Sequence, residues 1–199
     1  MGKEMLFPLK AEGKRGMNMP LKNWERIRDE KIDGKIFDMS PAPSYQHSVV
    51  NGRLFTRISN GLRDSMCLVF MENIDYKYSK ESDDYLEPDI IICCDRNQIR
   101  GNSYYGTPKF VAETISPSTV KRDRGIKKDI YEASGVEEYW IVSPIERAVE
   151  IYYLRDGKYE LEESYILDPD EASEHYNLHQ KITLRAFPIT MTLEDIFVF

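Results

Sequence analysis

Cysteine and histidine are both scarce in this chain, which has three of each among 199 residues. The cysteines include no CxxC pair, which argues against a zinc ribbon. Cys93 and Cys94 are adjacent within an apolar run, where neighbouring side chains of a strand point to opposite faces. We therefore expect no stabilising disulfide, and a reducing, cytoplasmic compartment.

The sequence also lacks a long apolar run and an excess of basic residues. Its longest aliphatic stretch, from Ile90 to Cys94, is far below the ~18 residues that suggest a membrane-spanning helix. Lys, Glu, Gly and Pro interrupt the first 20 residues before the apolar region of a signal peptide can form. The formal charge of −7 argues against a protein that coats nucleic acid non-specifically, although a small basic groove remains compatible with it. We expect no membrane partner.

Enough apolar material is present for a core, because 41% of the residues are hydrophobic and 12% are aromatic. We expect an N-terminal arm over residues 1–20 and a single domain over residues 21–199. The local patterns predict helices over 21–30, 45–62 and the segment between 119 and 135, and strands over 35–39, 67–71, 88–94, 109–116, 138–143 and 181–187. A hairpin is expected at Asp156-Gly157, and a final turn over 193–199.

The strand, helix, strand unit between residues 109 and 143 predicts two parallel strands, because such crossovers are right-handed within one sheet. The fold class is therefore α/β or α+β with one central mixed sheet.

Two acids stand in the middle strands of this predicted sheet. Asp89 opens one apolar run, and Glu113 interrupts another on the face that it shares with Val111 and Ile115. A buried carboxylate needs a cation, either a basic side chain or a metal ion.

The same two acids also allow a purely structural interpretation. Asp89 can cap a turn, and Glu113 can form a salt bridge outward from an edge strand. A basic cluster follows the Glu113 strand between Lys121 and Lys128, and it can pair with Glu113 or contact phosphate. Spacing alone leaves both interpretations open.

The order of several short motifs resembles the Uma-two (Uma2) family of restriction-endonuclease-like proteins, in the PD-(D/E)XK superfamily. The resemblance covers about residues 20–155. The motifs are Ile32-Asp33-Gly34, residues 38–44 followed by His47, Glu87-Pro88-Asp89, residues 111–119, Asp123 with Lys127 and Tyr131, and residues 135–142. The family implies a restriction-endonuclease-like core, in which helices flank a central mixed sheet and acids cluster where its middle strands diverge.

The resemblance also implies roles for individual residues. Asp89 and Glu113 would be catalytic metal ligands, and the backbone carbonyl of Thr114 would complete the coordination. The Lys that usually stands two residues after the Glu is replaced by Ile115. Lys127 of the next helix is the expected substitute, chosen over Lys128.

Three further residues are candidate accessory members of the site. Asp123 lies one helical turn from Lys127, so the two share a face. Glu30 precedes the Asp-Gly turn, and first-helix glutamates join the acidic cluster in some members of the superfamily. His47 either lines the site, as the family pattern implies, or has only a capping role in the neighbouring turn.

The implied activity is the hydrolysis of DNA phosphodiester bonds by a divalent-metal-dependent endonuclease. The implied cofactor is Mg²⁺, with Mn²⁺ as a substitute, because carboxylates and waters suit these ions. The alternative is a catalytically inactive protein of the same fold that binds nucleic acid or a partner, an alternative prompted by Ile115 and the net negative charge. A homodimer is expected for double-strand cleavage, with the strands at 147–165 as its edge.

Overall fold

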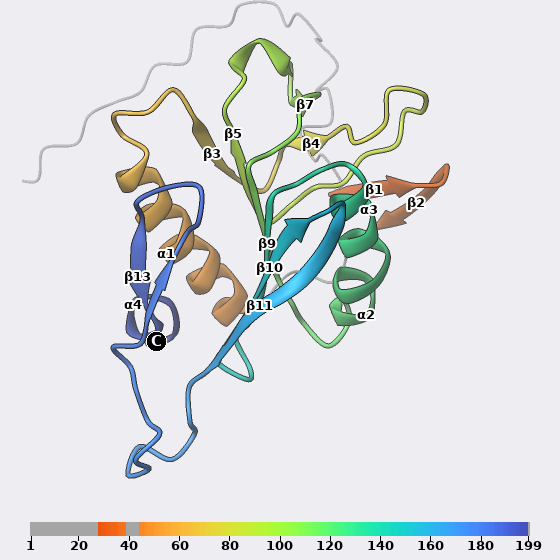
Figure 1. Ribbon diagram of the computed structural model, residues 1–199. Coiled ribbons are helices and arrows are strands. Elements are labelled where there is room, and N and C mark those ends of the chain that lie inside the picture. The colour runs from red at the N-terminus through yellow and green to blue at the C-terminus, as the bar shows by residue number, and fades with distance from the viewer. Residues whose placement is uncertain (1–27, 39–43, 199) are drawn as a thin grey trace, which may run out of the picture.

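A computed structural model describes residues 28–38 and 44–198 of the chain. Its centre is a six-stranded sheet in the order β11-β10-β9-β8-β5-β3 (Figure 1). The strands are β3 (Leu68–Met71), β5 (Ile90–Cys93), β8 (Phe110–Thr114), β9 (Glu138–Ser143), β10 (Ala148–Arg155) and β11 (Lys158–Ile166). Strands β8 and β9 run parallel, as predicted, and every other pair in this sheet is antiparallel. The chain thus has a mixed α/β fold.

Smaller elements surround the sheet. The helical elements are α1 (Tyr45–Gly61), α2 (Val120–Arg122), the π-helical stretch η2 (Asp123–Lys127), α3 (Lys128–Ala133), α4 (Leu193–Phe197) and the 3₁₀ turn η1 (Arg96–Gln98). The remaining strands are β1 (Asp29–Ile32), β2 (Lys35–Asp38), β4 (Asp75–Tyr76), β6 (Ile99–Arg100), β7 (Ser103–Tyr104), β12 (Lys181–Thr183) and β13 (Thr190–Thr192). None of the helices in the described residues has the length and apolar character needed to span a membrane.

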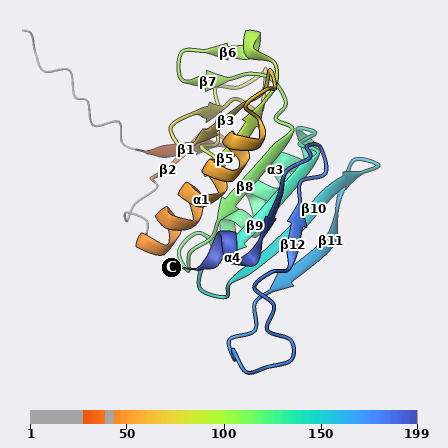
Figure 2. The same cartoon turned by 90° about the vertical axis from the view of Figure 1, so that its left-hand side faces the viewer.

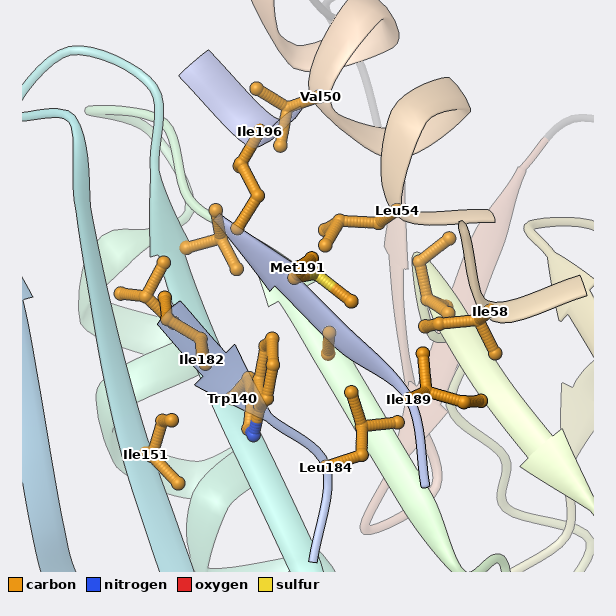
Figure 3. Close-up of a cluster of buried hydrophobic side chains, with 14 of the residues drawn as sticks. Val50, Leu54, Ile58, Trp140, Ile151, Ile182, Leu184, Ile189, Met191 and Ile196 are labelled. Carbon is orange, nitrogen blue, oxygen red and sulfur yellow. The ribbon is translucent and has the colours of Figure 1, made fainter. Parts of the chain in front are cut away.

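One face of the sheet is covered by α1 together with the C-terminal segment β12, β13 and α4 (Figure 2). Ser44 caps the N-terminus of helix α1, since its hydroxyl accepts from the His47 amide, and the helix buries Val50, Leu54 and Ile58 against this face. Figure 3 shows these side chains meeting Trp140 and the C-terminal segment. Gly61 lets that segment approach closely, because a Cβ there would lie 2.4 Å from a side-chain carbon of Ile189. We call this cluster the apolar face.

The opposite face carries α2, η2 and α3, with the β1–β2 hairpin beside them (Figure 1). Its buried side chains include Ile91, Val111 and Ile115, together with the tyrosines Tyr131 and Tyr139. Glu113, which alternates with Val111 and Ile115 along β8, is buried on this face as well. We call it the polar face, because it also holds most of the buried charged residues.

Most predicted elements are present, with two main differences. The predicted helix over residues 21–30 lies largely outside the described residues, and its last two residues, Asp29 and Glu30, belong to strand β1. These two residues are extended because β1 pairs with β2, with Glu30 opposite Phe37 across a tight turn. The small sheet β4-β7-β6 was not predicted, because its strands have only two residues each.

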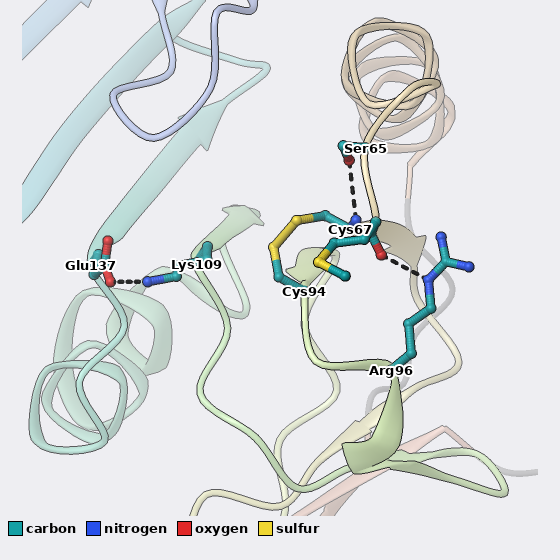
Figure 4. The surroundings of a disulfide bond; sticks show 7 residues. Ser65, Cys67, Cys94, Arg96, Lys109 and Glu137 are labelled. Carbon is teal, nitrogen blue, oxygen red and sulfur yellow. Dashed lines mark hydrogen bonds and ion pairs between the residues drawn. A yellow bond between two sulfur atoms is a disulfide. The ribbon is translucent and has the colours of Figure 1, made fainter.

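The expectation of no disulfide is wrong, because Cys67 and Cys94 are bonded to each other (Figure 4). Strands β3 and β5 pair with Leu68 opposite Cys93, so the next residues outward, Cys67 and Cys94, face one another. The adjacent pair Cys93 and Cys94 indeed cannot bond within a strand. The partner across the sheet is set by strand order, which the sequence pattern does not reveal. Cys93 remains a buried free thiol.

Candidate active site

Asp89 and Glu113 lie opposite each other where β5 and β8 diverge. The last ladder pair is Ile90 with Ala112, so Asp89 and Glu113 occupy the next register position, on the polar face. Only 5% of Asp89 and 2% of Glu113 is exposed. The described structure therefore brings together two buried carboxyl groups at the ends of adjacent strands.

Asp89 is held through one of its two oxygens. The backbone amide of Thr114 donates to Oδ2 over 2.9 Å, and Nε2 of His47 lies 3.1 Å from the same atom. The other oxygen, Oδ1, is 4.0 Å from a guanidinium nitrogen of Arg28. Burial raises the pKa of Asp89, but His47, Lys127 and the Thr114 amide outweigh it, so the pKa falls below its usual range. Asp89 is therefore an ionised carboxylate with Oδ2 saturated and Oδ1 more open.

Lys127 sits at the centre of the remaining acids. Its ammonium nitrogen lies 2.6 Å from Oε1 of Glu113, 2.8 Å from Oε1 of Glu30 and 3.6 Å from Oδ1 of Asp123. The Tyr131 hydroxyl donates to the same Glu113 oxygen over 2.6 Å. The spacing of Asp123, Lys127 and Tyr131 places all three on the helix face that meets Glu113.

The charges of this cluster depend on one another. Burial lowers the pKa of Lys127, but Glu113, Glu30 and Asp123 outweigh that effect and hold it well above the usual range. Burial raises the pKa of Glu113 and of Asp123, with Lys127 opposing the rise in both cases. One lasting positive charge thus stands among several carboxyl groups that compete for it.

Lys128, the neighbouring candidate, points elsewhere. Its ammonium lies 4.0 Å above the ring of Tyr152, and among the described residues no ion pair joins it to the acids of the site. Lys127 is instead almost wholly buried, at 2% exposure. Ile115, which stands where a lysine is usual, packs into the polar face and is 7% exposed.

Glu30 reaches the site from strand β1. Its Oε1 accepts the backbone amide of Glu87 over 3.1 Å in addition to the Lys127 contact, and Oε2 lies 3.8 Å from Arg122. A helix was expected here, but the strand carries Glu30 to the same cluster. All six side chains predicted for the site, namely Glu30, His47, Asp89, Glu113, Asp123 and Lys127, are buried. Contacts join the first group, Lys127 with its three acids, and the second, His47 with Asp89, and the strand register places Asp89 beside Glu113.

Sequence reasoning missed Glu72, which extends the site beyond Asp89. One ligand atom each from His47, Glu72 and Asp89 lies within 4.8 Å of the others. The Glu72 amide donates to the backbone carbonyl of Asp89 over 3.0 Å, and its carboxylate lies 2.9 Å from Arg28. The sequence signal that could have identified Glu72 is its position directly after β3, the strand that pairs with β5. The imidazole and the two carboxylates are donors that suit a divalent metal ion.

Comparison with known proteins agrees with this architecture. The model of the Uma2 family, described as "Putative restriction endonuclease", matches residues 18–187. An uncharacterized protein of Synechocystis, slr1290, is 27% identical over 179 residues, which is 87% of each chain.

A solved structure shares the fold. The crystal structure of "a putative nuclease belonging to DUF820" from Anabaena variabilis superposes with a TM-score of 0.65, covering 86% of this chain and 90% of that one. The two sequences are 18% identical, so this likeness supports the fold.

Proposed function

The chain belongs to the Uma2 family, and from this premise we propose that it is a divalent-metal-dependent endonuclease that hydrolyses phosphodiester bonds of DNA. The observation that carries the proposal is the register of Asp89 against Glu113 at the open end of two strands, with the buried ammonium of Lys127 beside them. A purely structural ion pair needs one acid for one base. Here the acids of the cluster outnumber the cations beside them, which are Lys127, Arg28 and Arg122, and this leaves carboxylate charge for a metal ion.

The proposal assigns a role to each member of the cluster. Asp89, through Oδ1, and Glu113 would hold Mg²⁺ or Mn²⁺ together with the Thr114 carbonyl, because carboxylate and carbonyl oxygens suit these ions. A bound ion of this kind polarises a phosphoryl oxygen and lowers the pKa of its water. Lys127 supplies fixed positive charge where negative charge develops on the phosphate. Tyr131 orients Glu113 through its hydrogen bond.

A plasmid-cleavage assay tests the proposal. Supercoiled DNA is incubated with the protein in Mg²⁺, in Mn²⁺ and in EDTA, with Asp89→Asn as the site variant. Asp95→Asn is the matched control, because Asp95 follows the other end of β5 and caps η1 through a bond that asparagine can also make. We expect cleavage by the wild type and Asp95→Asn with either metal, and none by Asp89→Asn.

Cleavage that persists in EDTA, or that equals the wild type in Asp89→Asn, contradicts the proposal. DNA binding without any cleavage would instead favour the alternative function, an inactive nuclease fold that acts as a binding module.

A homodimer remains part of the proposal, since two sites on opposite strands are needed for a double-strand cut. Strand β11 forms an edge of the sheet and exposes Leu161 and Ile166. Light scattering at micromolar concentration measures the mass. A monomer that nicks but does not linearise a plasmid would remove the dimer from the proposal and keep the chemistry.

A further inference from the structure

Four groups form a closed ring of hydrogen bonds around the end of the sheet. The Thr114 hydroxyl lies 2.5 Å from Oδ1 of Asn51, and Nδ2 of Asn51 lies 3.4 Å from Nδ1 of His47. Nε2 of His47 then reaches Oδ2 of Asp89 at 3.1 Å, and that oxygen accepts the Thr114 amide. Asn51 is 1% exposed and lies on the buried side of α1. The ring thus runs from the apolar face to the candidate active site.

The chemistry of the ring allows one direction of donation. An ionised aspartate only accepts, so Nε2 of His47 carries the proton that faces Asp89. In the neutral imidazole, Nδ1 is then a bare acceptor, which the amide NH₂ of Asn51 satisfies. The amide oxygen of Asn51 is left to accept from the Thr114 hydroxyl, and the short contact between these atoms is typical of two oxygens. Each contact of the ring therefore joins one donor to one acceptor.

We propose that Asn51 is a positioning residue that holds His47 as the Nε2–H tautomer, so that His47 orients Asp89 by a hydrogen bond and is not a metal ligand. This inference rests on the proposed function, because it concerns the ligand set of the same site. The hydrogen bonds occupy Oδ2 of Asp89, which leaves Oδ1 for the ion. The site is then built from oxygen ligands, which favour Mg²⁺ and Mn²⁺ over Zn²⁺.

The competing ligand set is the group of His47, Glu72 and Asp89. For His47 to bind a metal through Nε2, its proton has to move to Nδ1. A proton on Nδ1 would face the NH₂ group of Asn51, which is itself a donor. An aspartate at position 51 would instead accept from both Nδ1–H and the Thr114 hydroxyl. Asn51→Asp should therefore reverse the tautomer and turn a bare Nε2 toward Asp89 and Glu72.

Nitrogen NMR of ¹⁵N-histidine-labelled protein reads the tautomer directly. Spectra are recorded without metal at alkaline pH, where the imidazoles are neutral. His175 and His179 are exposed and lie outside the ring, so they serve as internal references. We expect His47 to show a protonated Nε2 and a bare Nδ1 in the wild type, and the reverse in Asn51→Asp. Asn60→Asp, at an exposed position of the same helix, should match the wild type.

A Zn²⁺ titration of the same samples reads the ligand set. The His47 resonances of the wild type should not show a zinc-bound nitrogen, whereas Nε2 of His47 in Asn51→Asp should. Asn51→Leu, which removes the donor to Nδ1, should lower Mn²⁺ affinity by about 10–100-fold in calorimetry, the usual effect of losing a partner behind a ligand.

A wild-type His47 that is bare at Nε2, or that binds zinc there, overturns the inference. That measurement needs only wild-type protein, so it holds even if Asn51→Asp does not fold. It is also independent of cleavage, which separates its failure from a failure of the proposed nuclease function.

Discussion

The two faces of the central sheet are built from alternate residues of the same strands, yet they differ in chemistry. Ile90, Ala112 and Trp140 point to the apolar face, whereas Ile91, Glu113 and Tyr139 point to the polar face. The apolar face packs aliphatic side chains against α1 and the C-terminal segment. The polar face buries a lysine among carboxyl groups, which costs stability that the apolar face has to supply. This contrast indicates that stability and chemistry are assigned to opposite sides of one sheet.

The largest expected effect is a loss of stability from the apolar face. Leu54→Ala removes a fully buried side chain, and Leu→Ala changes in cores cost about 2–5 kcal/mol (Figure 3). Urea unfolding measures the change, and Thr56→Ala on the exposed side of α1 is the control. Cleavage per folded molecule should stay at the wild-type rate. A selective loss of cleavage would show that the two faces are not separate.

The second-largest effect concerns the polar face and the rate of DNA cleavage. Lys127→Met removes the ammonium beside Glu113 while leaving metal binding largely intact, and we expect cleavage to fall by about 10²–10³. Lys128→Met is the matched control, because that lysine lies over Tyr152. Single-turnover cleavage and Mn²⁺ calorimetry separate rate from binding. Unchanged cleavage in Lys127→Met would move the role to another residue.

The disulfide tests how far the apolar face depends on a covalent link. Cys67 and Cys94 pack against this face and close a loop with a sequence separation of 27. By the loop-entropy relation, replacing both by serine should cost about 3–4 kcal/mol. Urea unfolding with and without reductant measures it, and reductant should not affect the double variant. Equal stability of oxidised and reduced wild type would contradict the expectation.

The smallest effect concerns Glu138, the buried acid of the apolar face, which accepts from the Trp140 indole and the Arg185 amide. Burial raises the pKa of Glu138 from 4.5 to about 7. Between these values the folded protein keeps a proton that the unfolded chain releases, so stability falls as pH rises, and above about pH 7 this cost is constant.

The total over this range should be up to about 3 kcal/mol, at 1.36 kcal/mol per pKa unit. Glu138→Gln should remove this fall in stability with pH. The difference in unfolding free energy between the wild type and Glu138→Gln should therefore change from pH 5 to pH 8. Urea unfolding at both pH values measures it. A constant difference would mean that Glu138 is ionised throughout this pH range. DNA cleavage should not depend on this residue.

Local patterns were sufficient for much of the fold. The four-residue spacing of apolar side chains predicted α1 within a residue at each end, and alternation placed Glu113 on the face of Val111 and Ile115. The Asp156-Gly157 turn was predictable because both residues adopt positive φ, which this pair tolerates. Residues 29–30 were predicted wrongly, since a spacing of three among their neighbours suggested a helix, whereas pairing with β2 makes them a strand.

The sequence alone was sufficient to identify the residue types available to the site and, apart from Glu30 and Glu72, the element that carries each of them. It predicted Asp89, Glu113 and Lys127 together only through a family resemblance, because neither periodicity nor spacing measures the distance between elements. The tertiary structure decided that Cys94 meets Cys67, that Glu72 joins the site, and that Asn51 lies between His47 and Thr114. Where these contacts join different elements, the residues lie far apart in the sequence, up to 63 positions for Asn51 and Thr114. Strand order and register set them, and both are properties of the folded chain as a whole.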